Sequence, residues 1–254
     1  MASTTTTTTT TDPSATKPTV VCVFCGSHPG NNPAHLASAR ALAHIFHREN
    51  ITLIYGGGTG GIMGELARTL VSLSGPKSVH GIIPSALVKI ENGYRTALTG
   101  PKAERAAMER GKEPERVIVV SDGDESADGE SEYGLTTLVP DMHTRKRVMA
   151  EKVMEGGPGS GFVVLAGGFG TLEEAMEVVT WNQLGIHHQG IVLLNIEGYW
   201  DGLMEWVERA VKDEFVSEVN KGIFVECKRV EEVVGALRAY RLCEGRYSLD
   251  WSRS

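Results

Sequence analysis

Short apolar segments recur along the chain and are separated by stretches with a different, helical period. Val, Ile and Leu follow one another in these segments without polar alternation, a pattern typical of strands buried on both faces of a parallel sheet. Most of the segments end in glycine, serine or proline, which terminate strands. They are VVCVFCGS from residue 20, ITLIYGGG from 51, SVHGIIP from 78, VIVVSDG from 117, GFVVLAGG from 161 and GIVLLNI from 190.

Helices are predicted between these strands, because apolar residues there recur at helical spacing. Alternating strands and helices predict an α/β fold: a Rossmann-like open parallel sheet with helices on both faces, which makes a three-layer sandwich. Ligands of such sheets bind beyond the carboxyl ends of the strands. The predicted helical ranges are 34–49, 62–73, 143–155, 172–184, 199–212 and 230–242.

Residues 20–242 are predicted to form a single domain, and other stretches stand apart from it by composition. Residues 1–19 are rich in threonine and of low complexity, which is typical of a disordered tail. Acidic residues crowd the stretch 121–133, where their mutual repulsion favours a solvated loop. Residues 99–115 are charged and suit a loop or an exposed helix, and residues 243–254 form a C-terminal tail.

Composition indicates a soluble, cytoplasmic protein. The 254 residues are 41% hydrophobic, which is enough for one large core. The formal net charge is -7, so binding to nucleic acid through its phosphates is not expected. No apolar run approaches the roughly 20 residues of a membrane span. The N-terminal tail also lacks the apolar stretch of a secretory signal.

The cysteines are predicted to be buried, reduced and without metal. Cys22 and Cys25 spell CxxC, but both lie in the first apolar segment, where positions three apart point to opposite faces of a strand. They therefore cannot easily bridge or chelate. Cys227 and Cys243 have no companion pair, so no metal site is predicted.

Two strand ends run into helices through clusters of glycine. A helix N-terminus presents unpaired amides and the positive end of its dipole, and glycine lets an anion approach this backbone, so each cluster suits a phosphate group. A tight turn without a ligand is the alternative for either cluster alone, and their pairing on one sheet edge favours binding. Ser27, at the end of the first strand, adds a hydroxyl or simply closes a turn. The residues predicted to bind phosphate are Gly57, Gly58, Thr59 and Gly60 of the first cluster and Gly167, Gly168, Gly170 and Thr171 of the second.

The first cluster also satisfies the GxGxxG motif of dinucleotide-binding folds, through Gly56, Gly58 and Gly61. That motif needs an acidic residue about twenty positions further on, which holds the ribose hydroxyls. The corresponding region reads SVHGIIP and contains no acid, so NAD is not expected. The GxxxxGK motif of a P-loop is also absent from the sequence.

Glu174 has two explanations in the sequence. Thr171 and Glu174 fit a capping box, in which Thr171 caps the helix and Glu174 folds back onto its amide. Glu174 also lies one helical turn beyond the second glycine cluster, where its carboxylate would face a sugar whose phosphate is bound at that cluster. The sequence leaves both open.

A basic segment, DMHTRKR from residue 141, opens another predicted helix. Arg145 carries a planar guanidinium that suits a phosphate or a carboxylate and stays charged near neutral pH. For Lys146 and Arg147 a solvated basic face is an equally good explanation. His143 is assigned no role in proton transfer.

These motifs together resemble those of one enzyme family. AGGFGTLEE, which ends at Glu174, is similar to the PGGxGTxxE signature of the Lonely Guy (LOG) family of cytokinin-activating phosphoribohydrolases, and MHTRK, around Arg145, is similar to its MHxRK motif. FCGS, YGGGTGGIMG and GIIP match in the same order, so the resemblance spans residues 20–206. Ala166 and Thr144 replace the usual proline and glutamate, and the two motifs lie farther apart than usual.

The resemblance implies hydrolysis of the N-glycosidic bond of cytokinin riboside 5′-monophosphates, with AMP as a further substrate, to free base and ribose 5-phosphate without a cofactor. It implies that Arg145 and Glu174 are the catalytic pair and that Met142 and Lys146 contact the substrate. It also implies a homodimer with shared active sites, or a higher oligomer.

Two alternatives remain open from the residues. A noncatalytic carrier of a nucleotide or cofactor has the same fold, and turnover separates it from an enzyme. A PLP-dependent lysine decarboxylase, a label attached to this family, needs a buried lysine for a Schiff base and an acid beside the pyridinium nitrogen. The sequence offers no credible lysine for that role.

Overall fold

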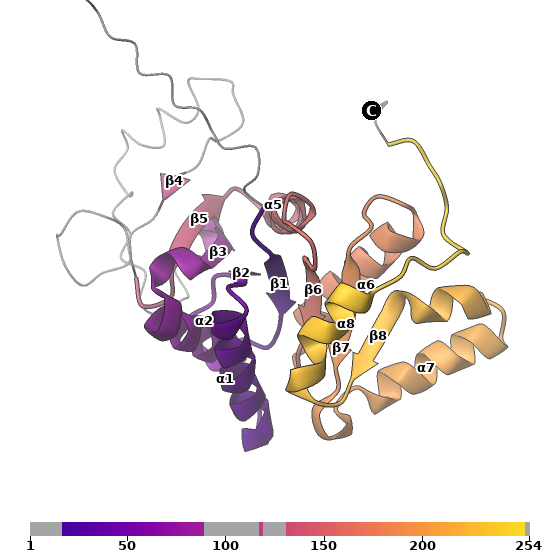
Figure 1. The fold of residues 1–254 in the computed structure, drawn as a ribbon, viewed down its shortest axis with the longest axis horizontal. Helices are drawn as coiled ribbons and strands as arrows, with labels where there is room; N and C mark the ends of the chain where they lie inside the picture. The colour runs from indigo at the N-terminus through magenta and orange to yellow at the C-terminus, as the bar shows by residue number, and fades with distance from the viewer. Residues whose placement is uncertain (1–16, 89–116, 119–130, 252–254) are drawn as a thin grey trace, which may run out of the picture.

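The computed structural model describes residues 17–88, 117–118 and 131–251. Within them the chain alternates between strands and helices along its length (Figure 1). Nearly all of the predicted threonine-rich tail, the whole charged stretch 99–115 and most of the predicted acidic loop 121–133 lie outside the described residues.

An eight-stranded sheet runs through the middle of the molecule (Figure 1). Its strands lie in the order β4-β5-β3-β2-β1-β6-β7-β8, and every neighbouring pair is parallel except β4 with β5. The chain moves outward from β1 through β2 and β3, then returns to the other side of β1 as β6, which creates a switch point between β1 and β6. The strands are β1 Val20–Phe24, β2 Thr52–Tyr55, β3 Val79–Pro84, β4 Val117–Ile118, β5 Leu135–Val139, β6 Gly161–Val164, β7 Gly190–Leu194 and β8 Phe224–Cys227.

Helices cover both faces of this sheet, so the predicted Rossmann-like α/β architecture is confirmed. None of the helices in the described part of the chain combines the length and hydropathy needed to cross a membrane. The α-helices are α1 Pro33–Arg48, α2 Gly61–Ser74, α3 Ser85–Val88, α5 Met142–Met154, α6 Phe169–Gln183, α7 Asp201–Lys212 and α8 Val233–Ala239. Short 3-10 helices are η1 Pro76–Ser78, η2 Ile196–Gly198, η3 Glu218–Ile223 and η4 Val230–Glu232.

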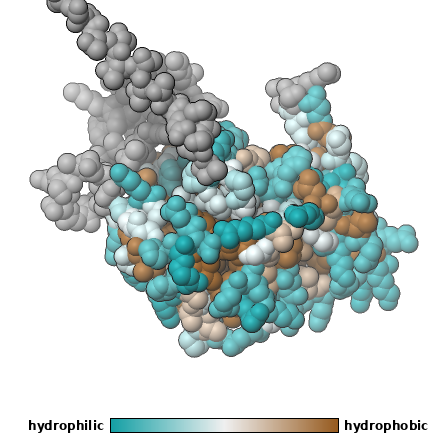
Figure 2. Space-filling model, in the orientation of Figure 1, coloured by the Kyte–Doolittle hydropathy of each residue, from teal (hydrophilic) through white to brown (hydrophobic). Residues whose placement is uncertain are grey.

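Two hydrophobic cores lie on opposite faces of the sheet. Val21 and Val23 of β1 pack with α1, α2 and α8, whereas Cys22 and Phe24 pack with α5, α6 and the segment before α7. Alternate residues of one strand thus enter two cores, which explains why the sequence shows no polar alternation there. Hydrophilic side chains cover much of the face seen in Figure 2, and hydrophobic patches show between them.

The described cysteines are all free, and Cys22 and Cys25 lie in different cores, as the strand geometry predicts. Cys227 is also buried. The prediction of burial is wrong for Cys243, which is only half-buried because it lies on the C-terminal segment rather than in the sheet or a core helix.

Several element predictions are corrected by the structure. The segment predicted as a strand from residue 117 is described only as the two-residue β4, an antiparallel edge strand. Neither β5 nor β8 was predicted. β5 contains two threonines, and β8 is a short edge strand in which Glu226 is exposed, so neither has a continuous apolar pattern. The last helix, predicted to reach residue 242, ends at Ala239 after a 3-10 start.

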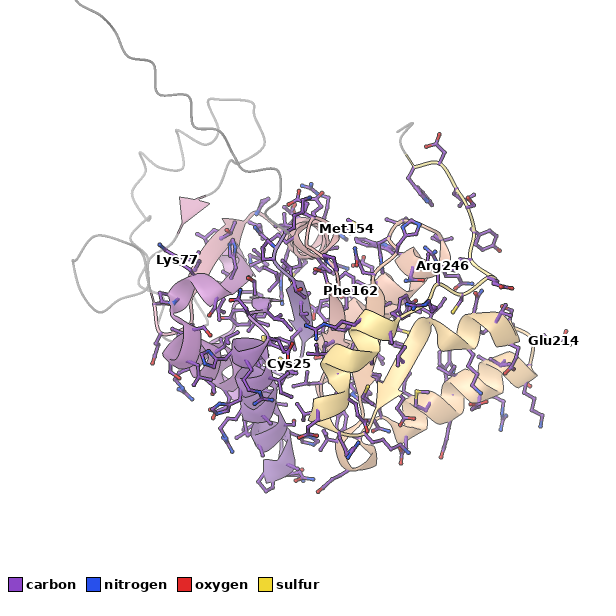
Figure 3. All side chains as sticks on the ribbon, in the orientation of Figure 1. Cys25, Lys77, Met154, Phe162, Glu214 and Arg246 are labelled. Carbon is purple, nitrogen blue, oxygen red and sulfur yellow. The ribbon has the colours of Figure 1, made fainter. Side chains whose placement is uncertain are left out.

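The C-terminal segment packs against the end of α6. The Arg246 guanidinium donates from Nε to the carbonyl of Asn182 and from Nη2 to that of His187 at 2.6 Å (Figure 3). The amide of Tyr247 and the indole of Trp251 donate to the next carbonyls of the same turn. These hydrogen bonds hold the C-terminal segment against the end of α6 and the loop that follows it.

Candidate active site

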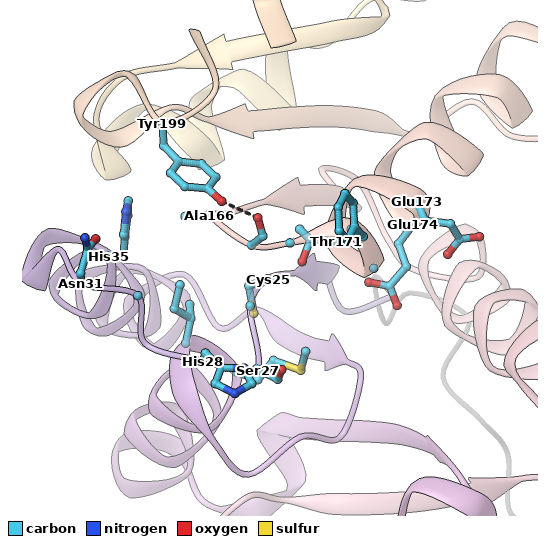
Figure 4. A pocket seen from close by; sticks show the side chains of 18 of the residues that line it. Cys25, Ser27, His28, Asn31, His35, Ala166, Thr171, Glu173, Glu174 and Tyr199 are labelled. Atoms are coloured by element: carbon cyan, nitrogen blue, oxygen red, sulfur yellow. Dashed lines mark hydrogen bonds between the residues drawn. The ribbon is translucent and has the colours of Figure 1, made fainter. Parts of the chain in front are cut away.

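A cavity of about 600 Å³ opens at the carboxyl ends of β1 and β6, beside the switch point of the sheet (Figure 4). Its walls come from the loop after β1, the start of α5, the turn before α6 and the loop before α7. The predicted residues that line it are Ser27, Met142, Arg145, Gly167, Gly168, Gly170, Thr171 and Glu174. Gly57, Gly58, Thr59, Gly60 and Lys146 do not belong to its described lining.

The second glycine cluster forms the N-terminus of α6 at one wall of the cavity. Gly168 is the N-cap, and the amides of Phe169, Gly170 and Thr171 donate to no acceptor within the described ranges. A Cβ on Gly167 would lie 2.1 Å from Oγ1 of Thr171, so only glycine fits there. Three amides and the positive end of a helix dipole therefore face the cavity, which is a favourable arrangement for a phosphate group.

Of the two explanations left open for Glu174, the capping box with Thr171 does not hold. The helix begins at Phe169, three residues before its predicted start at 172, and its N-cap is Gly168, without a side-chain cap. Thr171 is buried within the first turn, and the Glu174 carboxylate points across to α5. Glycine at the cap leaves the first amides of α6 without a competing side-chain acceptor.

Arg145 and Glu174 form an ion pair at the floor of the cavity. Nη2 of Arg145 lies 3.1 Å from Oε1 of Glu174, and the two side chains are only 9% and 7% exposed. Arg145 is held in the first turn of α5, whose N-cap Asp141 accepts from the amide of Thr144 at 2.8 Å. Nε of Arg145 is buried without an acceptor in the described part of the chain.

Burial raises the pKa of the Glu174 carboxyl above its ordinary value, although the guanidinium of Arg145 opposes this effect. The carboxylates of Glu173 and Glu177 raise the pKa of Glu174 further, and the Lys146 ammonium lowers it. A buried carboxylate with a raised pKa, beside a fixed cation in a cavity, is the combination that active sites use for proton transfer or charge stabilisation.

The first glycine cluster packs against Arg145 and the loop after β1, both of which line the cavity. A Cβ on Gly56 would lie 1.9 Å from Nη2 of Arg145, so this glycine makes room for the guanidinium. Gly61, at a φ of 58°, lies directly against the backbone of Ser27 and His28. The amides of Ile62 and Met63 donate to the carbonyl of Gly26. These amides at the start of α2 therefore bind the loop after β1.

Lys146 lies beside the ion pair and contacts two other carboxylates. Its ammonium pairs with Glu173 and, at 3.0 Å, with Oε1 of Glu177, both on α6. The Lys146 side chain is only 10% exposed. Burial by itself lowers the pKa of Lys146, but the hydrogen bonds to Glu173 and Glu177 raise it above its ordinary value. Lys146 therefore stays charged.

Tyr199 and His35 are among the lining residues that the sequence did not single out. Tyr199, in the loop before α7, donates its hydroxyl to the carbonyl of Gly167 (Figure 4). His35, in the first turn of α1, meets the Tyr199 ring edge-on at 5.2 Å and is 7% exposed. Asn32 links the same two loops by donating to Glu197 at 2.5 Å. Tyr199 and His35 each follow the end of a predicted strand at the carboxyl edge of the sheet, and this position is the signal in the sequence that points to them.

Comparison with known proteins places this chain in a family. The family model described as "Possible lysine decarboxylase" matches residues 63–237. The chain is 33% identical to the cytokinin riboside 5′-monophosphate phosphoribohydrolase LOG3 of Arabidopsis thaliana, over 89% of this chain and 85% of the relative. The chain belongs to the LOG family. The predicted resemblance is thus confirmed.

A longer relative is more similar in sequence. The chain is 44% identical to the bifunctional cytokinin biosynthesis protein of Fusarium pseudograminearum over 92% of its own residues. It spans only 43% of that relative's length. The molybdenum cofactor binding protein of Rippkaea orientalis has a TM-score of 0.52 at 13% identity, over 89% of this chain and 98% of that one, which shows a shared fold.

The decarboxylase description of the family model does not fit the cavity as a Schiff-base site for PLP. Such a site needs a lysine amine that reaches the cofactor. None of the residues described as lining the cavity is a lysine. Lys146, the lysine next to the ion pair, is engaged by two carboxylates that keep it protonated.

Proposed function

We propose that this LOG-family protein is an N-glycosidase that hydrolyses cytokinin riboside 5′-monophosphates to the free cytokinin base and ribose 5-phosphate. The observation that carries the proposal is the buried Arg145–Glu174 pair, which lies one helical turn beyond the unpaired amides at the start of α6. A phosphate group and the sugar attached to it fit these two features in that order.

The 5′-phosphate is bound at the start of α6. The amides from Phe169 to Thr171 donate to its oxygens, and Gly167 and Gly168 let it approach the backbone. Ser27 and Met142 line the same cavity and contact the substrate from the opposite wall. The sequence also assigns Gly57, Gly58, Thr59 and Gly60 to phosphate, but these residues do not belong to the described lining of the cavity. Their neighbours Gly56 and Gly61 instead make room for Arg145 and for the loop after β1.

The reaction breaks the bond between C1′ of the ribose and the base nitrogen, and the bonding electrons leave with the base. The ionised Glu174 carboxylate stabilises the oxocarbenium-like sugar and orients the attacking water, whose oxygen forms the new bond to C1′. The water gives up one proton, and the departing base takes one up. Arg145 fixes Glu174 and balances its charge.

A nucleotide panel tests this activity. The purified protein is incubated with isopentenyladenosine 5′-monophosphate, AMP and the unphosphorylated isopentenyladenosine, and release of the free base is followed by chromatography. The proposal expects base and ribose 5-phosphate in equal amounts from the modified nucleotide, and little release from the nucleoside, which lacks the phosphate. Nucleotide binding without any release would instead indicate a carrier.

We also propose that the protein acts as a homodimer. Phe169, at the rim of the cavity, is 95% exposed, and Trp206 of α7 is 54% exposed. A second, apolar hollow of about 600 Å³ lies between α6 and α7 and shares Tyr199 with the active-site cavity. Large exposed apolar residues of this kind mark interfaces, and a second copy seated there would cover both the hollow and the cavity rim.

The proposed location is the cytoplasm. The four described cysteines are free and three of them are buried, which is the use of cysteine common in reducing compartments. The formal net charge of -7 favours a small-molecule ligand over nucleic acid.

A further inference from the structure

A lysine–carboxylate cluster joins α5 to α6 directly beside the ion pair of the active site. Glu173 and Glu177 lie four residues apart on α6, and the Lys146 ammonium of α5 contacts both. Glu173 is 52% exposed, Glu177 is 25% exposed, and Lys146 itself is almost covered. Without the Lys146 ammonium, the carboxylates of Glu173 and Glu177 would carry two uncompensated negative charges beside the buried carboxylate of Glu174.

The order of residues along both helices ties this cluster to the active site. Lys146 follows Arg145 on α5, and Glu174 lies between Glu173 and Glu177 on α6. Two cross-links therefore join the same two helices. Arg145 and Glu174 both line the cavity, whereas in the second cross-link Glu173 lines it and Lys146 and Glu177 lie outside its described lining. A shift of either helix would change both.

We propose that Lys146 is a positioning residue for the reaction: it holds α5 against α6 and neutralises the carboxylates on both sides of Glu174. This inference rests on the proposed hydrolase function, and it assigns Lys146 a role other than the substrate contact that its motif suggests. The ammonium acts through Glu174 and does not touch the nucleotide.

The electrostatic surroundings of Glu174 support this role. Lys146 lowers the pKa of Glu174, whereas Glu173 and Glu177 raise it. The thiols of Cys22 and Cys25 stay neutral because burial raises the pKa of both. The groups that face Glu174 are Arg145 and Lys146 from α5, Glu173 and Glu177 from α6, and Cys22 and Cys25 from β1 and its end.

The test is a carboxyl titration of Glu174 in substrate-free protein, with ¹³C-labelled glutamate and Glu174→Gln to assign the signal. Lys146→Met is expected to move the midpoint of this titration to higher pH, and Lys146→Met/Glu177→Gln to bring it back. Glu177→Gln alone should move it to lower pH, which keeps the test decisive if Lys146→Met does not fold. Arg147→Met is the matched control, because Arg147 is the next residue, is 49% exposed and pairs with Glu151 on its own helix.

The pH profile of base release gives a second readout. Lys146→Met should keep its KM near the wild-type value and lose kcat mainly on the acid side of the profile, and Lys146→Arg should restore it. An unmoved titration of Glu174, or a KM effect without a change in the profile, would overturn the inference and indicate direct substrate contact. If the wild type releases no base from any nucleotide, the proposed function fails, whereas the titration still decides the role of Lys146.

Discussion

The guanidinium of Arg145 and the carboxylate of Glu174 are paired at 3.1 Å inside the protein, although each comes from the first turns of a different helix. A buried ion pair gives little net stability, because desolvation of both charges offsets their attraction. Its position in a cavity beside unpaired helix amides supports the proposed catalytic role of the pair.

Gly56→Ala should disable the site, although Gly56 does not belong to the described lining of the cavity. The new Cβ would lie 1.9 Å from Nη2 of Arg145 and would push the guanidinium away from Glu174. We expect base release to fall by roughly a hundredfold, as for the misplacement of a catalytic group. Steady-state kinetics measures the loss. Gly235→Ala in α8 is the control: nothing lies within 4 Å of its Cβ, so activity should stay unchanged.

Tyr199→Phe should weaken nucleotide binding. The Tyr199 hydroxyl donates to the carbonyl of Gly167 and so fixes the turn that presents the α6 amides. Loss of one such hydrogen bond costs about 1 kcal/mol, or roughly fivefold in KM. Tyr247→Phe serves as the control, because Tyr247 is 58% exposed and contacts α6 through its backbone. Equal kinetics for Tyr199→Phe and wild type would remove the turn from the binding mechanism.

His187 should make the fold sensitive to mild acid. Its Nε2 donates to the carbonyl of Val178 at 2.8 Å, and its Nδ1 accepts from the amide of Gln189, which only the neutral ring can do. Burial lowers the pKa of His187 from 6.5 to about 4. The folded state therefore binds this proton less tightly than the unfolded chain, so stability is complete above pH 6.5 and falls as the pH drops toward 4.

Urea unfolding at several pH values measures this effect. The urea concentration at the wild-type midpoint should decrease as the pH is lowered from 6.5 to 4. His187→Asn should make the midpoint less dependent on pH over this range. The neighbouring His188 is exposed, so His188→Asn should retain the wild-type dependence. A wild-type midpoint that is constant over this range would contradict the assignment.

Trp206→Glu should dissociate the proposed dimer. A charge at this position would face the apolar hollow between α6 and α7, where its burial is unfavourable. Light scattering after size exclusion gives the mass. Phe215→Glu is the control, because Phe215 is 85% exposed and lies outside the lining of that hollow. A monomeric wild type would remove the shared-site proposal.

The sequence predicts the sheet well where strands are buried on both faces. Val21 and Val23 enter one core and Cys22 and Phe24 the other, so the apolar run of β1 is unambiguous. β5 reads LTTLV and lies near the sheet edge, where polar residues are tolerated, so its pattern is weak. The pairing partners of such strands are set by tertiary contacts that no local pattern contains.

The site shows the same division. Glu174 and Arg145 are predictable from their motifs, because each follows a helix start at the carboxyl edge of the sheet. The role of Gly56 is not predictable from the sequence, since it depends on contact with the side chain of Arg145, which lies far away along the chain. Lys146 likewise reads as a surface cation until its two partners on α6 are seen.

The central claim is that Glu174 carries out the chemistry while the α6 amides bind the phosphate. Single-turnover release of base from isopentenyladenosine 5′-monophosphate by Glu174→Gln, with nucleotide affinity measured on the same sample, tests it most directly. The account predicts binding close to wild type and a rate lower by about a hundredfold to ten-thousandfold. A rate within a few fold of wild type at equal occupancy would contradict it.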